Sequence, residues 1–143
     1  MKMNAYLSFD GRCEAAFRFY ETALQGKVTM MMRYKEAPPE TCGPESEPHD
    51  EKAGERIMHA RLVAGDAVLM GGDAPAPYYS KPQGICVSIN VDTPAEADRV
   101  FGALADGATI QMPIAETFWA DRFGMLTDKF GTPWMINCEK KGG

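Results

Sequence analysis

Few side chains in this sequence combine the type and surroundings needed for acid–base catalysis. Of the two histidines, His49 lies in an acidic, proline-rich stretch and His59 lies in an apolar stretch. Imidazoles exchange protons readily near neutral pH, so His59 is a candidate general base or a hydrogen-bond donor to a ligand. A strand histidine that forms only local contacts is the alternative. Glu116 is a second catalytic candidate, and its alternative is a surface ion pair.

The four cysteines, at positions 13, 42, 86 and 138, are widely spaced and form no CxxC pair. This spacing argues against a zinc knuckle and against a thioredoxin-type redox motif. The N-terminal stretch MKMNAYLSFDG lacks the apolar core of a signal peptide, and no segment approaches ~20 apolar residues. We therefore expect a cytoplasmic protein with reduced thiols and no membrane partner. The net charge of −5, without a basic run, also argues against nucleic-acid binding.

In the first half, residues 3–9 predict a strand, and Asp10 with Gly11 provides a turn and a helix cap. The helix should end near Gly26, and residues 27–35 read as the next strand. The apolar face of this helix has the spacing i, i+3, i+4, i+7 and i+11. The residues of that face are Cys13, Ala16, Phe17, Tyr20 and Leu24.

The second half repeats this plan. Residues 84–91 predict an apolar strand, and Thr93 with Glu96 forms a capping-box pattern at the start of a helix. Gly107 can end the helix, and residues 108–119 follow as a strand. The apolar stripe of this helix consists of Ala97, Val100, Phe101 and Leu104.

Two further strands follow in each half, and Gly65 with Asp66 suits a tight turn between the first pair. These strands are predicted at 56–64, 67–72, 122–128 and 133–138. The order is therefore βαβββ twice, an α+β pattern within one domain of residues 1–143. We divide it into module one at about 1–73, a linker at about 74–83 and module two at about 84–140.

Residues 35–55 are rich in proline and acidic side chains. They predict an exposed loop, and a lid over a pocket is the alternative function for this stretch.

Two long stretches, YLSFDGRCEAAFRFYETAL and ETFWADRFGMLTDKFGTPWMIN, resemble the PhnB-like branch of the vicinal oxygen chelate superfamily. IMHARL and SINVDTPAEADRVF extend the resemblance over nearly the whole chain. That superfamily includes glyoxalase I, extradiol dioxygenases and the bleomycin- and fosfomycin-resistance proteins. The resemblance implies paired βαβββ modules with curled mixed sheets around a cavity, and commonly a homodimer.

In the enzymes of this superfamily, a divalent metal held by His, Glu or Gln acts as a Lewis acid on substrate oxygens. We transfer the superfamily's metal-ligand pattern to this sequence by position. In the last strand Asp128 and Gly131 match the pattern, but the position of the expected Glu is occupied by Met135. The other three ligand positions fall at Cys86, at Met70 and near Asn4 or Ala5. None supplies imidazole or carboxylate, the ligands that such metals favour. We therefore expect neither a metal nor another cofactor, with a divalent metal as the disfavoured alternative.

The same positions are candidate ligand contacts. Met70, Cys86 and Met135 would form a soft apolar cavity floor, and Asn137 shares a strand face with Met135. Trp119 would stack on a ligand at the mouth of the pocket. Core packing of the methionines and turn structure around Trp119 are the simpler alternatives.

Three functions are compatible with these residues. The first is a metal-free homodimer that binds an unknown small molecule. The second is an enzyme, either a metal-dependent lyase, isomerase or dioxygenase with displaced ligands, or a catalyst that uses His59. The third is a structural dimer without a ligand. The branch also carries a methyltransferase-like label, but no GxGxG-type loop follows the first predicted strand.

Overall fold

The structure is a computed structural model that describes residues 1–36 and 54–140. It divides into two units, unit 1 at Met1–Ser80 and unit 2 at Lys81–Gly143. The predicted loop 35–55, with His49 and Cys42, lies largely outside the described residues. No helix in the described part of the chain is long and apolar enough to cross a membrane.

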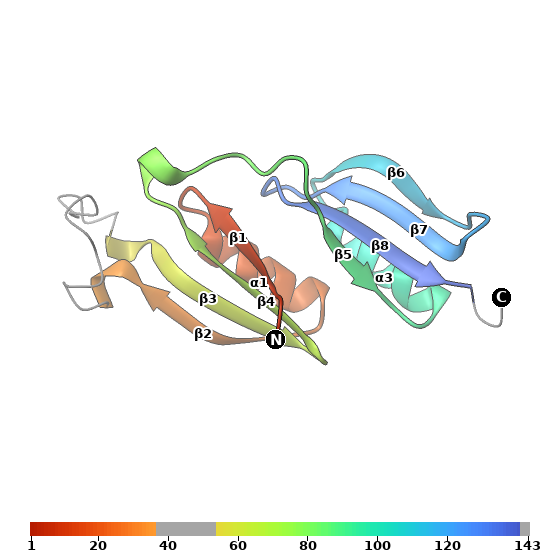
Figure 1. The fold of residues 1–143 in the computed structure, drawn as a ribbon, viewed down its shortest axis with the longest axis horizontal. Coiled ribbons are helices and arrows are strands. Elements are labelled where there is room, and N and C mark those ends of the chain that lie inside the picture. The colour runs from red at the N-terminus through yellow and green to blue at the C-terminus, as the bar shows by residue number, and fades with distance from the viewer. Residues whose placement is uncertain (37–53, 141–143) are drawn as a thin grey trace. The chain divides into compact units, whose positions relative to one another are not determined.

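In its described residues, unit 1 has a four-stranded sheet with the helix of residues 13–23 across it (Figure 1). The strand order is β1-β4-β3-β2, in which β1 and β4 are parallel and the other neighbours are antiparallel. A short 3-10 helix, η1, follows β2, and another, η4, follows β4. The elements are β1 (Ala5–Phe9), α1 (Cys13–Ala23), β2 (Lys27–Arg33), η1 (Tyr34–Glu36), β3 (Ile57–Ala64), β4 (Ala67–Asp73) and η4 (Ala76–Tyr78).

Unit 2 repeats the arrangement with strand order β5-β8-β7-β6. Again the outer pair β5 and β8 is parallel, and the other pairs are antiparallel. The elements are β5 (Val87–Asn90), α3 (Pro94–Leu104), β6 (Thr109–Ala115), β7 (Ala120–Thr127) and β8 (Pro133–Glu139). The predicted α+β fold with two βαβββ modules is confirmed, and both mixed sheets are open rather than closed on themselves.

Each helix packs closely on its sheet because a strand glycine faces it. A Cβ on Gly71 of β4 would lie 2.8 Å from the Phe17 ring, and one on Gly124 of β7 would lie 2.7 Å from the Phe101 ring. Such distances leave no room for a side chain at either position. Phe17 and Phe101 are both buried, and burial of one such ring contributes about 2–3 kcal/mol.

The two helices begin in different ways. Thr93 Oγ1 accepts a hydrogen bond from the Glu96 backbone N–H at 3.1 Å, which confirms the predicted N-cap of α3. The predicted cap at Asp10 is wrong, because the N-cap residue of α1 is Arg12 and no side chain caps the helix from that position. The capping carboxylate comes instead from Asp73, at the end of β4.

Candidate functional site

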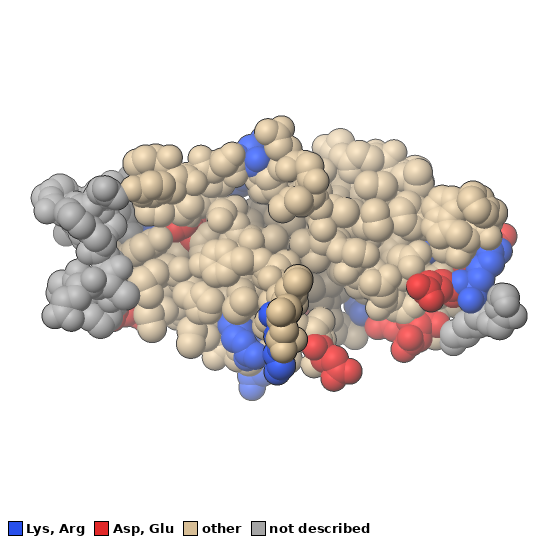
Figure 2. Space-filling view, in the orientation of Figure 1, with Lys and Arg blue, Asp and Glu red and all other residues tan. Residues whose placement is uncertain are grey.

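The sheet face opposite the helix is called the open face of each unit. Gly71 faces α1, so strand alternation places its neighbours Met70 and Gly72 on the open face of unit 1. Gly124 faces α3 and pairs with Ile136, which places Met135 on the open face of unit 2. Figure 2, in the orientation of Figure 1, shows that uncharged side chains cover most of the surface in view over each sheet.

On the open face of unit 1, Tyr6 of β1 and His59 of β3 stack across the intervening strand β4. Their ring centroids lie 5.9 Å apart with an interplanar angle of 25°. The Tyr6 hydroxyl donates to the Met58 carbonyl at 3.3 Å. Gly72 makes this possible, because a Cβ there would lie 2.8 Å from the Tyr6 hydroxyl. The pKa of Tyr6 is raised, mainly because the phenol is partly buried and secondly because of Cys13.

Met70 lies in the same row of this face, between Tyr6 of β1 and Arg61 of β3. Arg61 is also the cross-strand partner of Met30. Its guanidinium donates to Thr29 Oγ1 at 3.3 Å. Within residues 1–36 and 54–140, no carboxylate pairs with Arg61. The predicted contact Met70 therefore belongs to a methionine-rich surface that also carries the guanidinium of Arg61.

On the open face of unit 2, Asn137 lies between Asn90 of β5 and Phe123 of β7. Its side-chain amide donates to Asn90 Oδ1 at 3.1 Å, and its own Oδ1 is buried without a hydrogen-bond partner among the described residues. Trp119 packs edge-on against Phe123 with ring centroids 5.4 Å apart. Phe123 therefore links the predicted contacts Trp119 and Asn137, and Met135 follows on the same face of β8.

Cys86 lies elsewhere in unit 2. It precedes β5, because the parallel pairing with β8 begins only at Val87 and Trp134. The predicted strand 84–91 is therefore shorter than expected, and residues 82–86 line a cavity of about 420 Å³. Met125 and Pro133 line this cavity together with Cys86, whereas Met135, Asn137 and Trp119 do not.

The position of Cys86 predicts selective alkylation. Its thiol is free and exposed, whereas Cys13 and Cys138 are buried. Burial, with Asp73 and Glu14 nearby, also raises the pKa of Cys13 and disfavours its reactive thiolate. In a Cys42→Ser background, we expect iodoacetamide at pH 8 to add one adduct per native chain, on Cys86. Peptide mass spectrometry checks this, and fast labelling of Cys13 in the folded chain would contradict the described packing.

Glu116, the second catalytic candidate, is exposed at the end of β6. Its Oε2 lies 3.7 Å from Lys140 Nζ, and its side chain is 66% exposed. Such an exposed pair contributes little and leaves the carboxylate well solvated. The geometry therefore favours the surface ion pair that the sequence left as the alternative.

The described donor set does not fit the divalent metal that the superfamily resemblance implies. Ala5 pairs with Leu69, which faces α1, so Ala5 lies on the helix side of its sheet. Met70 and Met135 are on open faces but offer only thioethers, and Cys86 lies outside the strand. No group of three or more His, Cys, Asp and Glu side chains suited to a metal ion occurs in the described stretches.

Sequence reasoning missed the buried carboxylate of Asp73. Its Oδ1 accepts from the backbone N–H groups of Gly11 at 2.8 Å and Cys13 at 3.0 Å, and its Oδ2 accepts from Ile57 N–H at 2.8 Å. It therefore joins the end of β4 to the start of α1 and the start of β3. The only signal in the sequence was an acidic residue directly after an apolar strand.

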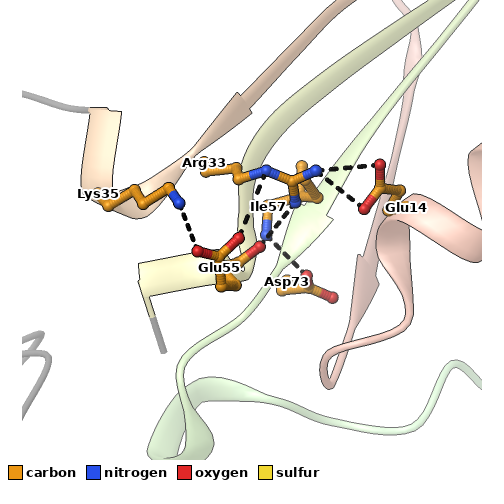
Figure 3. A network of polar contacts seen from close by, with 6 residues as sticks. All are labelled: Glu14, Arg33, Lys35, Glu55, Ile57 and Asp73. Carbon is orange, nitrogen blue, oxygen red and sulfur yellow. Dashed lines mark hydrogen bonds and ion pairs between the residues drawn. The ribbon is translucent and has the colours of Figure 1, made fainter. Parts of the chain in front are cut away.

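A charged network lies beside Asp73 (Figure 3). Arg33 Nη2 lies 3.0 and 3.1 Å from the two Glu14 oxygens, and its Nη1 donates to the Glu55 carbonyl at 2.8 Å. Lys35 also pairs with the Glu55 carboxylate. These contacts raise the pKa of Arg33, chiefly through its hydrogen bond to Glu14, and lower that of Glu55, chiefly through Lys35. Because the cations and carboxylates satisfy one another, the network fits a structural role.

Comparison with known proteins agrees with this fold along the whole chain. The family model described as Glyoxalase/Bleomycin resistance protein/Dioxygenase superfamily matches residues 2–136. Protein YjdN of Escherichia coli (strain K12) is 34% identical over 148 residues, covering 99% of this chain and 97% of YjdN. The crystal structure of protein PA1353 from Pseudomonas aeruginosa is 44% identical, with a TM-score of 0.85, and the match covers 97% and 98% of the two chains.

The chain therefore belongs to the glyoxalase/bleomycin resistance protein/dioxygenase superfamily. The likeness to PhnB-type proteins is also confirmed. A structure described as a putative 3-demethylubiquinone-9 3-methyltransferase, PhnB protein, from Bacillus cereus has a TM-score of 0.74. At 24% identity over 96% of this chain and 99% of that one, it shares the fold.

Proposed function

We propose that this chain is a metal-free, cytoplasmic, homodimeric protein that binds a small molecule on the open faces of its sheets. The proposal rests mainly on one observation, the chemistry of the positions where the superfamily's enzymes hold their metal. Here those positions carry thioether, thiol, amide and methyl side chains in place of imidazole and carboxylate. A hard or borderline divalent cation has little affinity for such a set.

The open faces support ligand binding rather than a purely structural role. Tyr6 is 51% exposed, and Trp119 is 47% exposed beside Phe123. Aromatic and methionine side chains offer a flat, adaptable apolar surface, and a few polar groups among them fix a ligand's orientation. The amides of Asn90 and Asn137 provide such polar groups in unit 2.

A thermal-shift screen of small aromatic compounds, neutral and anionic, tests this proposal. A compound present at about 100 times its Kd stabilises the native state by about 2.7 kcal/mol, which raises the melting temperature by several degrees. We expect at least one such compound, and we expect Asn137→Leu or Met135→Glu to weaken its effect.

Glu96→Gln is the matched control, because it changes an exposed side chain on α3, which packs on the other face of the same sheet. It should leave the shift intact. A chain that responds to no compound, but is stabilised by one equivalent of Mn²⁺, Ni²⁺, Zn²⁺ or Fe²⁺, would contradict the proposed function and favour the metal-dependent enzyme.

A further inference from the structure

The open face of unit 1 carries a cation, Arg61, that has no carboxylate partner among residues 1–36 and 54–140. Arg61 lies between Met30 and Met70 in the strand register and is half-buried among them. In the described part of the chain its side chain donates only to the Thr29 hydroxyl, at 3.3 Å. A guanidinium has five N–H donors in a planar fork, so most of its hydrogen-bonding capacity is left for another group.

Two aromatic rings are fixed close to this cation. His59 lies two residues from Arg61 on the same strand face, about 7 Å away at the usual strand rise. Its ring stacks with Tyr6, and Tyr6 reaches across β4 only because Gly72 has no side chain. The stack is further held by the hydrogen bond from the Tyr6 hydroxyl to the Met58 carbonyl. It is therefore a preorganised aromatic surface that is half open to solvent.

We infer that this face binds a planar aromatic carboxylate, with the carboxylate on Arg61 and the ring over the Tyr6–His59 stack and the flanking methionines. The inference rests on the small-molecule binding proposed above and names the ligand class. The charge of Arg61 supports this class. A half-buried guanidinium with no carboxylate partner among the described residues favours an anion and forms paired hydrogen bonds with a carboxylate. The distance from His59 to Arg61 suits one or two fused rings bearing an acid group. In this arrangement His59 acts as a packing surface for the ligand.

Calorimetric titration of the chain with 2-naphthoate at about 0.1 M salt, where charges beyond ~10 Å are largely screened, tests the inference. We expect 2-naphthoate to bind at least tenfold more tightly than 2-naphthamide, its uncharged analogue of the same shape. Arg61→Gln should remove this preference. Arg61→Lys should retain part of it, because a lysine keeps the charge but loses the planar fork.

Arg18→Gln is the matched control, since it removes an exposed positive charge from α1, which packs on the other face of the same sheet. It should leave the affinity unchanged within about twofold, as expected for a distant exposed charge. Tyr6→Leu should weaken 2-naphthoate binding by removing one ring of the stack. Circular dichroism confirms that the variant is folded.

The outcomes separate this inference from the proposed function. Equal affinity for 2-naphthoate and 2-naphthamide would overturn the ligand class, as would an unchanged preference for the acid in Arg61→Gln. Either result would leave the proposed small-molecule binding in place. Failure of both probes to bind would also overturn it, because the site would then not accept a planar aromatic acid. The broader binding function is judged separately by the thermal-shift screen and by the response to metals.

Discussion

Replacing Asp73 by alanine is expected to lower the free energy of unfolding by about 3–5 kcal/mol. The carboxylate is only 2% exposed and accepts hydrogen bonds from three backbone N–H groups. Alanine leaves these donors without an acceptor, and each unsatisfied buried donor costs about 1–3 kcal/mol. Water entering the space would recover part of that loss, so the expected total is below the sum.

Asp73→Asn should also destabilise, by a smaller amount. The amide keeps one acceptor oxygen, but its NH₂ group would face a backbone N–H donor, either that of Ile57 or those of Gly11 and Cys13. Urea denaturation of the three proteins gives the comparison. Asp10→Ala is the matched control, because Asp10 is an exposed acidic residue, 3.7 Å from Arg12, in the β1–α1 loop that the Asp73 carboxylate caps.

The control should change stability by no more than about 0.5 kcal/mol. Similar losses of unfolding free energy in Asp10→Ala and Asp73→Ala would contradict the capping role of Asp73. Amide hydrogen exchange locates the effect, because the strands and helix that Asp73 joins should lose protection first. The hydrogen bonds to Asp73 also support the open face of unit 1, since β3 and β4 carry His59, Arg61 and Met70.

The second large effect is expected in unit 2. Asp128 is 4% exposed and holds the turn between β7 and β8. Its Oδ1 accepts from the Phe130 and Thr132 backbone N–H groups at 2.8 and 3.0 Å, and its Oδ2 accepts from the Trp134 indole N–H at 2.8 Å. Asp128→Ala should therefore cost about 2–4 kcal/mol by leaving buried donors unpaired.

Trp134→Phe separates the indole contact from the turn contacts, because it removes the N–H and keeps an aromatic ring. A double-mutant cycle of Asp128→Ala and Trp134→Phe should give a coupling energy of about 1–3 kcal/mol. Strictly additive losses would mean that the carboxylate and the indole act independently, against the described geometry. Because β8 also carries Met135 and Asn137, Asp128→Ala should weaken ligand binding in unit 2 as well.

Local patterns in the sequence were sufficient to predict the architecture. The helical spacing of Cys13, Ala16, Phe17 and Tyr20 identified residues that the structure buries. Thr93 was recognisable as a cap because its partner Glu96 is three residues away. The βαβββ order followed from such short-range signals, and the matching of two halves made the superfamily recognisable.

Contacts between distant residues could not be predicted in the same way. Asp73 caps a helix that starts 60 residues earlier, so Asp10, the local acidic residue, was chosen wrongly. The Tyr6–His59 stack depends on the empty position at Gly72, which only the strand register reveals. Cys86 was assigned to a strand because residues 84–91 are apolar, but pairing with β8 begins one residue later.

The candidate site was therefore predictable in its residue types and only partly in its geometry. Alternation along β8 placed Met135 and Asn137 on one face, as the structure has them. Trp119 joins them through Phe123, a ring contact that no sequence spacing encodes. The roles of Met70, Cys86, Trp119, Met135 and Asn137 in binding remain predictions for the variants proposed above.

Metal analysis of the purified chain tests most directly whether this protein is metal-free. Elemental mass spectrometry after purification without chelators, followed by calorimetric titration with Mn²⁺, Ni²⁺, Zn²⁺ and Fe²⁺, measures both bound metal and affinity. Because the superfamily's ligand positions here carry Met70, Cys86, Met135 and Asn4 or Ala5, we predict well below one metal per chain and no stoichiometric site. One tightly bound divalent metal per chain would contradict the proposed metal-free function.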